Sequence, residues 1–201
     1  MFYYFLVFIK PLLWLIFRPK VYGNKKALGT KGKAIFICNH ISMRDPLMMS
    51  IISPRIIHYM AKKEIVKSKI GKIFFKSLFV IPVDRGKADI RSLKDALKEL
   101  EKGNAFGIFP EGRRMVADRM DEFETGIAFI AMRSGAPVIP MYLSNDSYKH
   151  WWTRPTFMVG DPIYADEVKL KVSNRENEAI FTQRLRNSID RLKKELDKKC
   201  R

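Results

Sequence analysis

Short apolar runs alternate along the chain with longer segments whose apolar residues recur every three or four positions. The short runs are rich in Val, Ile and Phe and predict β-strands, whereas the longer segments predict helices. We expect strands at residues 34–38, 79–83, 105–109, 138–143 and 156–159, with a weaker candidate at 58–61. We expect helices at residues 46–52, 64–76, 90–102, 125–134 and 175–198. Gly103 and Gly135 should end two of these helices, and the strongly charged last helix should lie on the surface. This alternation predicts an α/β fold: one layered domain with a largely parallel sheet flanked by helices.

The first 17 residues form a separate apolar segment, interrupted only by Lys10 and Pro11. No basic stretch precedes it and no small-residue cleavage site follows, so it does not resemble a signal peptide. It is shorter than the roughly 20 residues that cross a bilayer, and its proline falls near the middle. We therefore expect a helix that lies in the membrane interface, the alternative being a helix packed on the core. The predicted organisation is a membrane-associating segment at residues 1–22 and the main domain at residues 23–201.

Basic residues dominate the charge of the chain. Its 38 Lys and Arg residues against 21 Asp and Glu residues give a formal net charge of +17. No carboxylate occurs before Asp45, and a second basic cluster at residues 62–76 contains only Glu64 as an acidic residue. An acidic partner is implied, for which nucleic acid, an anionic membrane surface and a polyanionic substrate are all candidates. The two cysteines lie far apart in sequence, as expected for reduced thiols in a cytosolic setting.

The stretch Asn39–Pro46 carries the most informative chemistry. A predicted strand stops at His40, and Asp45 follows after four intervening residues. Imidazole is well suited to proton transfer near neutral pH, and a nearby carboxylate can fix its tautomer and stabilise its charged form. A structural interpretation is also open, because Asp45 could be the N-cap of a helix with Pro46 at its first position.

Two other apolar runs also end in polar groups, Asp84-Arg85-Gly86 and Pro110-Glu111-Gly112-Arg113-Arg114. The carboxyl ends of parallel strands meet at one edge of a sheet, so these groups should converge with His40 and Asp45. Arginine binds phosphate oxygens bidentately, which makes Arg85 and Arg114 candidate phosphate ligands. Ion pairs within the chain are the alternative for these side chains: Arg85 with Asp84 or Asp89, and Glu111 with Arg113.

The order and spacing of these segments resemble the glycerolipid acyltransferase family, and most closely its 1-acylglycerol-3-phosphate acyltransferases. The family motif Asn-His-x-Ser-x-x-Asp is matched at residues 39–45, and an apolar run that ends in Arg is matched at residues 79–85. Phe-Pro-Glu-Gly-Thr-Arg is matched at residues 109–114 with Arg113 in place of Thr, and Val-Ile-Pro at residues 138–140. The chain departs from the family at Glu124, where the family usually has Lys.

The resemblance implies an acyl transfer from acyl-CoA or acyl carrier protein to a lysophospholipid, in which His40 is the general base and Asp45 orients it. Arg85 and Arg114 would bind the acceptor phosphate. The acceptor site would also include Glu111, Gly112 and Arg113. Lys62 resembles a family lysine and would contact the oxyanion or the donor. The resemblance implies no cofactor, and a place at the cytoplasmic face of the cell membrane.

Two other functions remain open at this level. An acyltransferase with a different acceptor, such as a lyso-aminolipid without phosphate, is compatible with Glu124. A non-catalytic basic module that binds membrane or nucleic acid fits the charge, but no helix-turn-helix, RNA-binding aromatic platform or zinc pattern is visible, and we expect no nucleic-acid partner. We also expect no metal site, because no ligand spacing links the three histidines His40, His58 and His150.

Overall fold

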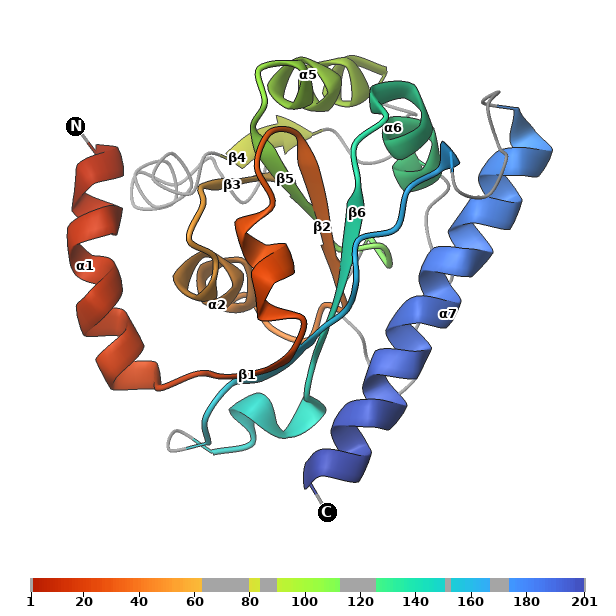
Figure 1. The fold of residues 1–201 in the computed structure, drawn as a ribbon. Helices are drawn as coiled ribbons and strands as arrows, with labels where there is room; N and C mark the ends of the chain where they lie inside the picture. Colours follow the sequence, from red (N-terminus) through yellow and green to blue (C-terminus); the bar gives the residue numbers. More distant parts are fainter. Residues whose placement is uncertain are drawn as a thin grey trace.

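The computed structural model describes residues 2–62, 80–83, 90–112, 126–150, 153–166 and 174–200. Within this part of the chain, one mixed sheet of seven strands has the order β1-β7-β6-β2-β5-β3-β4, with helices against both faces (Figure 1). The strands are β1 Lys20–Gly23, β2 Ala34–Cys38, β3 Ile57–Lys62, β4 Val80–Val83, β5 Ala105–Ile108, β6 Val138–Leu143 and β7 Thr156–Val159. The helices are α1 Phe2–Phe17, α2 Asp45–Ile52, α5 Ile90–Glu101, α6 Gly126–Ser134 and α7 Arg175–Cys200, and the short 3₁₀ helices are η1 Lys25–Gly29 and η2 Asn145–Tyr148.

The sheet is largely parallel, as predicted. β2 pairs in parallel with β5 and β6, and β3 pairs in parallel with β4 and β5. β7 is antiparallel to β6, and β1 runs parallel to β7. The carboxyl ends of β2 to β6 therefore lie at one edge of the sheet, where α/β proteins place their sites.

β2 lies at the centre of the core, with every residue fully buried. Its odd-numbered residues Ile35 and Ile37 belong to the cluster formed with α5, α6 and α7. Phe36 belongs to the cluster on the other face, together with residues of α2. Because successive side chains of a strand point to opposite faces, a strand covered on both sides must be apolar throughout, as this one is.

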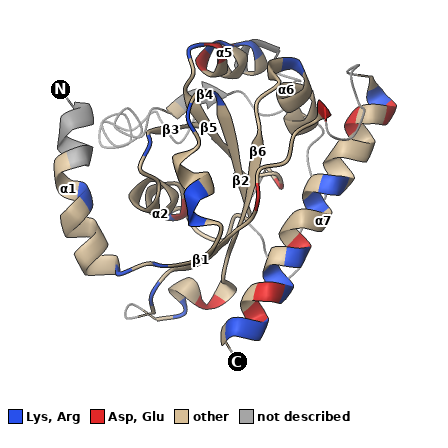
Figure 2. Cartoon of the chain, in the orientation of Figure 1, with Lys and Arg blue, Asp and Glu red and all other residues tan. Residues whose placement is uncertain are grey.

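The last helix is less exposed than its charge suggests. We expected residues 175–198 on the surface, and Figure 2 shows Lys, Arg, Asp and Glu along the whole length of α7. However, one stripe of the helix is buried against the sheet and α6, namely Phe181, Leu185, Ile189, Leu192 and Leu196. Steps of three and four residues bring these side chains to one face, so the helix lies on the surface as predicted and covers the core with this face.

Gly103 and Gly135 end α5 and α6 with positive φ angles of 80° and 60°, as their positions predicted. The strand β1 and both 3₁₀ helices were not predicted. β1 has four residues, and it is defined by its pairing with β7 rather than by its own apolar pattern. The helix predicted at residues 64–76 lies outside the described residues.

α1 lies beside α2 at the side of the molecule (Figure 1). Leu13 and Phe17 pack against the core, and the Lys10 ammonium donates a hydrogen bond to the carbonyl of Ser53. Burial lowers the pKa of Lys10. None of the helices in the described ranges has both the length and the apolar character needed to span a bilayer.

Candidate active site

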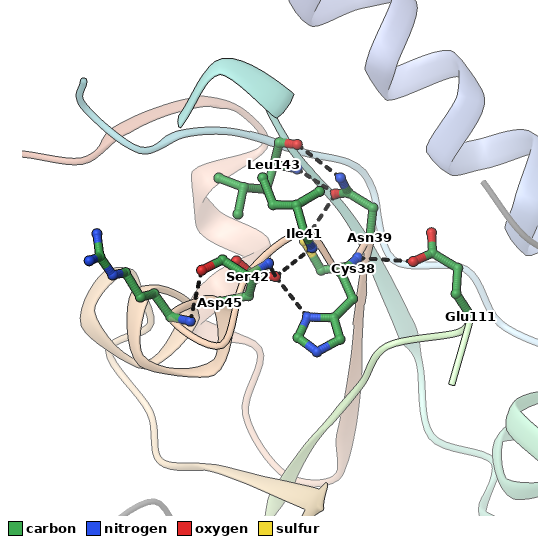
Figure 3. Close-up of polar contacts among 9 residues, drawn as sticks. Cys38, Asn39, Ile41, Ser42, Asp45, Glu111 and Leu143 are labelled. Atoms are coloured by element: carbon green, nitrogen blue, oxygen red, sulfur yellow. Dashed lines mark hydrogen bonds and ion pairs between the residues drawn. The ribbon is translucent and has the colours of Figure 1, made fainter. Parts of the chain in front are cut away.

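The loop that follows β2 meets two other segments at the carboxyl edge of the sheet. His40 comes two residues after the end of β2, Asp45 begins α2, and Glu111 follows β5. Figure 3 shows Asp45 and Glu111 on opposite sides of this loop. The parallel register of β2 with β5 and β6 places these side chains together, as the sequence predicted.

His40 and Asp45 are in direct contact. His40 Nδ1 lies 2.7 Å from Asp45 Oδ2, and the carboxylate is fully buried. The same oxygen accepts hydrogen bonds from the backbone N–H groups of Ile41, at 2.7 Å, and Ser42, at 2.8 Å. Three donors therefore converge on one oxygen, which stabilises a carboxylate away from water.

The interpretation of Asp45 as a helix N-cap is wrong. The N-cap of α2 is Arg44, which makes no capping hydrogen bond with its side chain, and Asp45 is the first helical residue. The Asp45 carboxylate points back to the preceding loop instead of forward to the amides of α2. Its hydrogen bonds fix that loop and the imidazole of His40. Asp45 thus accepts local hydrogen bonds, but from the loop before α2 and not from the first turn of α2.

The imidazole of His40 also packs against an aromatic side chain through one face of its ring. Its ring stacks on Phe109, with centroids 4.3 Å apart and an interplanar angle of 25°, and Tyr59 lies beyond Phe109 at 6.2 Å. With Nδ1–H donating to Asp45, the basic nitrogen of a neutral imidazole is Nε2. The His40 side chain retains 14% exposure. The arrangement can therefore remove a proton from a group that approaches Nε2.

Two buried polar side chains support the end of β2. Glu111 Oε2 accepts the backbone N–H of His40 at 3.1 Å. Asn39 bridges to β6, because its Nδ2 donates to the carbonyl of Leu143 at 2.9 Å and its Oδ1 accepts the N–H of Leu143 at 2.7 Å. Sequence reasoning counted Asn39 as part of the motif but assigned it no role. A buried amide at the end of an apolar strand was the available signal, since such a group must find partners.

The thiol of Cys38 lies beside this site but is not suited to attack a substrate. It is fully buried at the end of β2. Burial raises its pKa well above the usual value, and the charges of Asp45 and Glu111 raise it further. A protonated, inaccessible thiol is a poor nucleophile, so Cys38 is not a candidate for attack on a substrate.

The remaining predicted site residues are only partly described. Lys62 is the last residue of β3, whose end lies at the same edge of the sheet, and Gly112 forms a turn with a φ of 62° that favours glycine. Arg85, Arg113 and Arg114 lie outside the described residues. Within the described ranges, no three His, Cys, Asp or Glu residues are grouped so that they could hold a metal ion.

Comparison with known proteins identifies the family of this chain. Residues 18–144 match the family model described as Acyltransferase, and this match covers the loop with His40 and Asp45. The chain therefore belongs to the acyltransferase family and is an enzyme of this class.

The similarity extends to relatives with a more specific name. The chain is 32% identical to the 1-acyl-sn-glycerol-3-phosphate acyltransferase of Bacillus subtilis (strain 168), across 94% of this chain and 95% of the relative. It is 30% identical to the enzyme of the same name from Limnanthes douglasii, across 74% of this chain but only 52% of that relative. The chain thus spans nearly all of the bacterial relative and about half of the plant relative.

The fold is also found in a solved structure. The crystal structure of the 1-acyl-sn-glycerophosphate acyltransferase PlsC from Thermotoga maritima superposes with a TM-score of 0.71 and covers 95% of this chain and 78% of that chain. The identity between the two is 18%, so this likeness concerns the fold.

Proposed function

We propose that this enzyme transfers a fatty acyl group from acyl-CoA or acyl carrier protein to the free hydroxyl of 1-acylglycerol 3-phosphate, which yields phosphatidic acid for phospholipid synthesis. The observation that carries the proposal is the 2.7 Å contact between His40 Nδ1 and the buried carboxylate of Asp45. The names of the relatives support the choice of acceptor.

In the proposed mechanism, His40 Nε2 takes the proton of the acceptor hydroxyl as its oxygen attacks the thioester carbonyl. Asp45 stabilises the imidazolium that forms. A bond forms between the acceptor oxygen and the carbonyl carbon, the carbon–sulfur bond then breaks, and the leaving thiolate receives the proton from His40. The acceptor itself is the nucleophile, so no acyl-enzyme is needed. The buried, protonated Cys38 agrees with this direct transfer.

The direct test is an assay of purified protein with a labelled acyl donor and a panel of lysolipids. We expect the fastest transfer to 1-acylglycerol 3-phosphate. Preferred acylation of a lyso-aminolipid would support the alternative acceptor, and the absence of transfer to every lysolipid would reject the proposal. Parallel reactions with acyl-CoA and acyl carrier protein identify the donor.

Arg85 and Arg114 are proposed to bind the acceptor phosphate, and we expect Arg85→Ala and Arg114→Ala chiefly to raise the acceptor KM. Loss of a bidentate, charge-assisted contact corresponds to about 2 kcal/mol, or roughly a thirtyfold change. Both variants should also discriminate less against an unphosphorylated acceptor. Steady-state kinetics with the two acceptors measure both effects.

Arg191→Ala, on an exposed part of α7, is the matched control and should leave the kinetics unchanged. Unchanged kinetics in both site variants would show that these arginines do not bind the headgroup.

The first helix is proposed to lie in the membrane interface at the cytoplasmic face. Its exposed apolar side chains are Phe8, Leu12, Trp14, Leu15 and Ile16, and Phe8 is 79% exposed. Because Leu13 and Phe17 already cover the core side, these residues form a second apolar face with no partner among the described residues. Four exposed basic residues follow the helix in the sequence, namely Arg18, Lys20, Lys25 and Lys26. Apolar area next to positive charge is typical of a segment that binds anionic lipid surfaces.

Salt should separate the two contributions to membrane binding. The triple variant Phe8→Ser, Leu12→Ser, Leu15→Ser should bind anionic vesicles at low salt and leave them at high salt, because only charge remains, at about 1 kcal/mol per basic residue near the surface. Vesicle binding by the unaltered protein should become weaker at high salt but should not be lost. Co-sedimentation with vesicles across salt concentrations measures the difference. If the unaltered protein stays in the supernatant at low salt, the interfacial role of α1 is rejected.

A further inference from the structure

Among the described residues, the Asp45 carboxylate makes its hydrogen bonds through only one of its two oxygens. Oδ2 interacts with His40 and with two backbone N–H groups. Oδ1 is equally buried, and no donor among the described residues lies within hydrogen-bonding geometry of it. A buried carboxylate oxygen without a donor is costly, so a donor close to Oδ1 is expected.

The hydroxyl of Tyr148 is the complementary group. Its oxygen is also buried, and no partner in the described part of the chain lies within hydrogen-bonding geometry of it. Burial raises the pKa of this hydroxyl well above its usual range, and the charge of Asp45 and a side-chain contact with Asp45 raise it further. Tyr148 therefore keeps its proton and has a donor to offer to the carboxylate. Glu111 lies on the far side of the loop (Figure 3).

Tyr148 is also fixed in place. It ends η2, directly after β6, and Ser147 beside it accepts the N–H of Thr156 with its side chain at 3.1 Å. Asn39 ties the end of β6 to the end of β2. The Arg44 guanidinium lies 6.0 Å from the centre of the Tyr148 ring, so the residue before Asp45 contacts the same side chain.

We infer that Tyr148 is a positioning residue for acyl transfer: its hydroxyl donates a hydrogen bond to Asp45 Oδ1 and holds the carboxylate with Oδ2 turned toward His40. The inference rests on the proposed function, because it assigns Tyr148 a role in the orientation of the general base. The hydroxyl acts through Asp45 and does not touch the substrate.

The test begins with Tyr148→Phe, which removes one oxygen and keeps the ring. We expect kcat to fall about tenfold, the effect of one hydrogen bond to a charged group, with the KM of both substrates unchanged. In an Asp45→Asn background the same substitution should change kcat less than about twofold, because the two groups act as a unit. Tyr164→Phe, which alters an exposed tyrosine, is the matched control and should leave kcat unchanged.

A spectroscopic readout does not require activity. The proton on His40 Nδ1 should give a downfield NMR resonance that shifts in Tyr148→Phe and stays in place in Tyr164→Phe. A second signal needs no change at Tyr148: its hydroxyl proton should exchange slowly in the unaltered protein and shift in Asp45→Asn.

Three results would overturn the inference: an unchanged kcat in Tyr148→Phe, an equal loss in both Asp45 backgrounds, or a Tyr148 hydroxyl signal that does not respond to Asp45→Asn. An unaltered protein that acylates no lysolipid would reject the proposed function instead, and the two NMR signals would still decide whether Tyr148 is bonded to Asp45.

Discussion

His40→Ala should reduce acyl transfer by about a thousandfold or more while the protein stays folded. The substitution removes the group that accepts the proton of the acceptor hydroxyl, for which the described site offers no substitute, since Asp45 is buried behind the imidazole. It leaves the backbone N–H of His40 in place to bond Glu111. Initial rates with 1-acylglycerol 3-phosphate measure the loss, and circular dichroism checks the fold.

His58 provides the matched control. Its side chain is 12% exposed, close to the 14% of His40, so both substitutions remove a similarly buried ring. His58 Nδ1 lies 3.3 Å from the carbonyl of Ala105, at the start of β5 and thus at the opposite edge of the sheet. His58→Ala should lower stability and retain acyl transfer per folded molecule. Near-normal turnover in folded His40→Ala would exclude His40 as the base.

Asp45→Asn should lower turnover by about 10³-fold to 10⁴-fold, the range expected when a base loses the carboxylate that fixes its tautomer. Asparagine has nearly the same shape, and its carbonyl oxygen can still accept the N–H groups of Ile41 and Ser42 that bond Asp45 Oδ2. The loop should therefore persist while the negative charge beside the imidazole is lost. The measurement is kcat under saturating substrates, together with thermal unfolding.

Asp161→Asn is the control for this substitution. Asp161 follows β7 and accepts a hydrogen bond from Asn24 at 2.8 Å in an exposed position. Because β7 is antiparallel to β6, its end lies at the edge of the sheet opposite the candidate site. Asp161→Asn should keep full turnover. A loss in Asp45→Asn no larger than that in Asp161→Asn would show that the carboxylate of Asp45 has no part in the reaction.

The local pattern of apolar and polar residues was sufficient to predict most of the fold. The run Ala34–Cys38 is apolar at every position, which is the signature of a strand covered on both faces, and β2 is such a strand. Glycines at positive φ ended α5 and α6 where the sequence placed them. The His40–Asp45 pair was also visible, because its five-residue separation lies within one loop and the start of one helix.

The tertiary structure decided the features that depend on distant partners. β1 exists through its pairing with β7, and the bridge from Asn39 to Leu143 joins residues that are 104 positions apart. The direction of the Asp45 carboxylate was also undecided, because an aspartate before proline can cap its own helix or turn back to the loop with almost the same local sequence.

The sequence by itself determined most of the strands and helices, the apolar centre of the sheet and the residues available for chemistry at the end of β2. Those properties follow from side-chain periodicity and from residues that are close neighbours along the chain. Only the tertiary structure decided that the Tyr148 hydroxyl is buried together with Asp45, and that the charged helix α7 covers the core with one face. The physical reason is that burial and hydrogen-bond partners are set by packing between elements, which local composition does not encode.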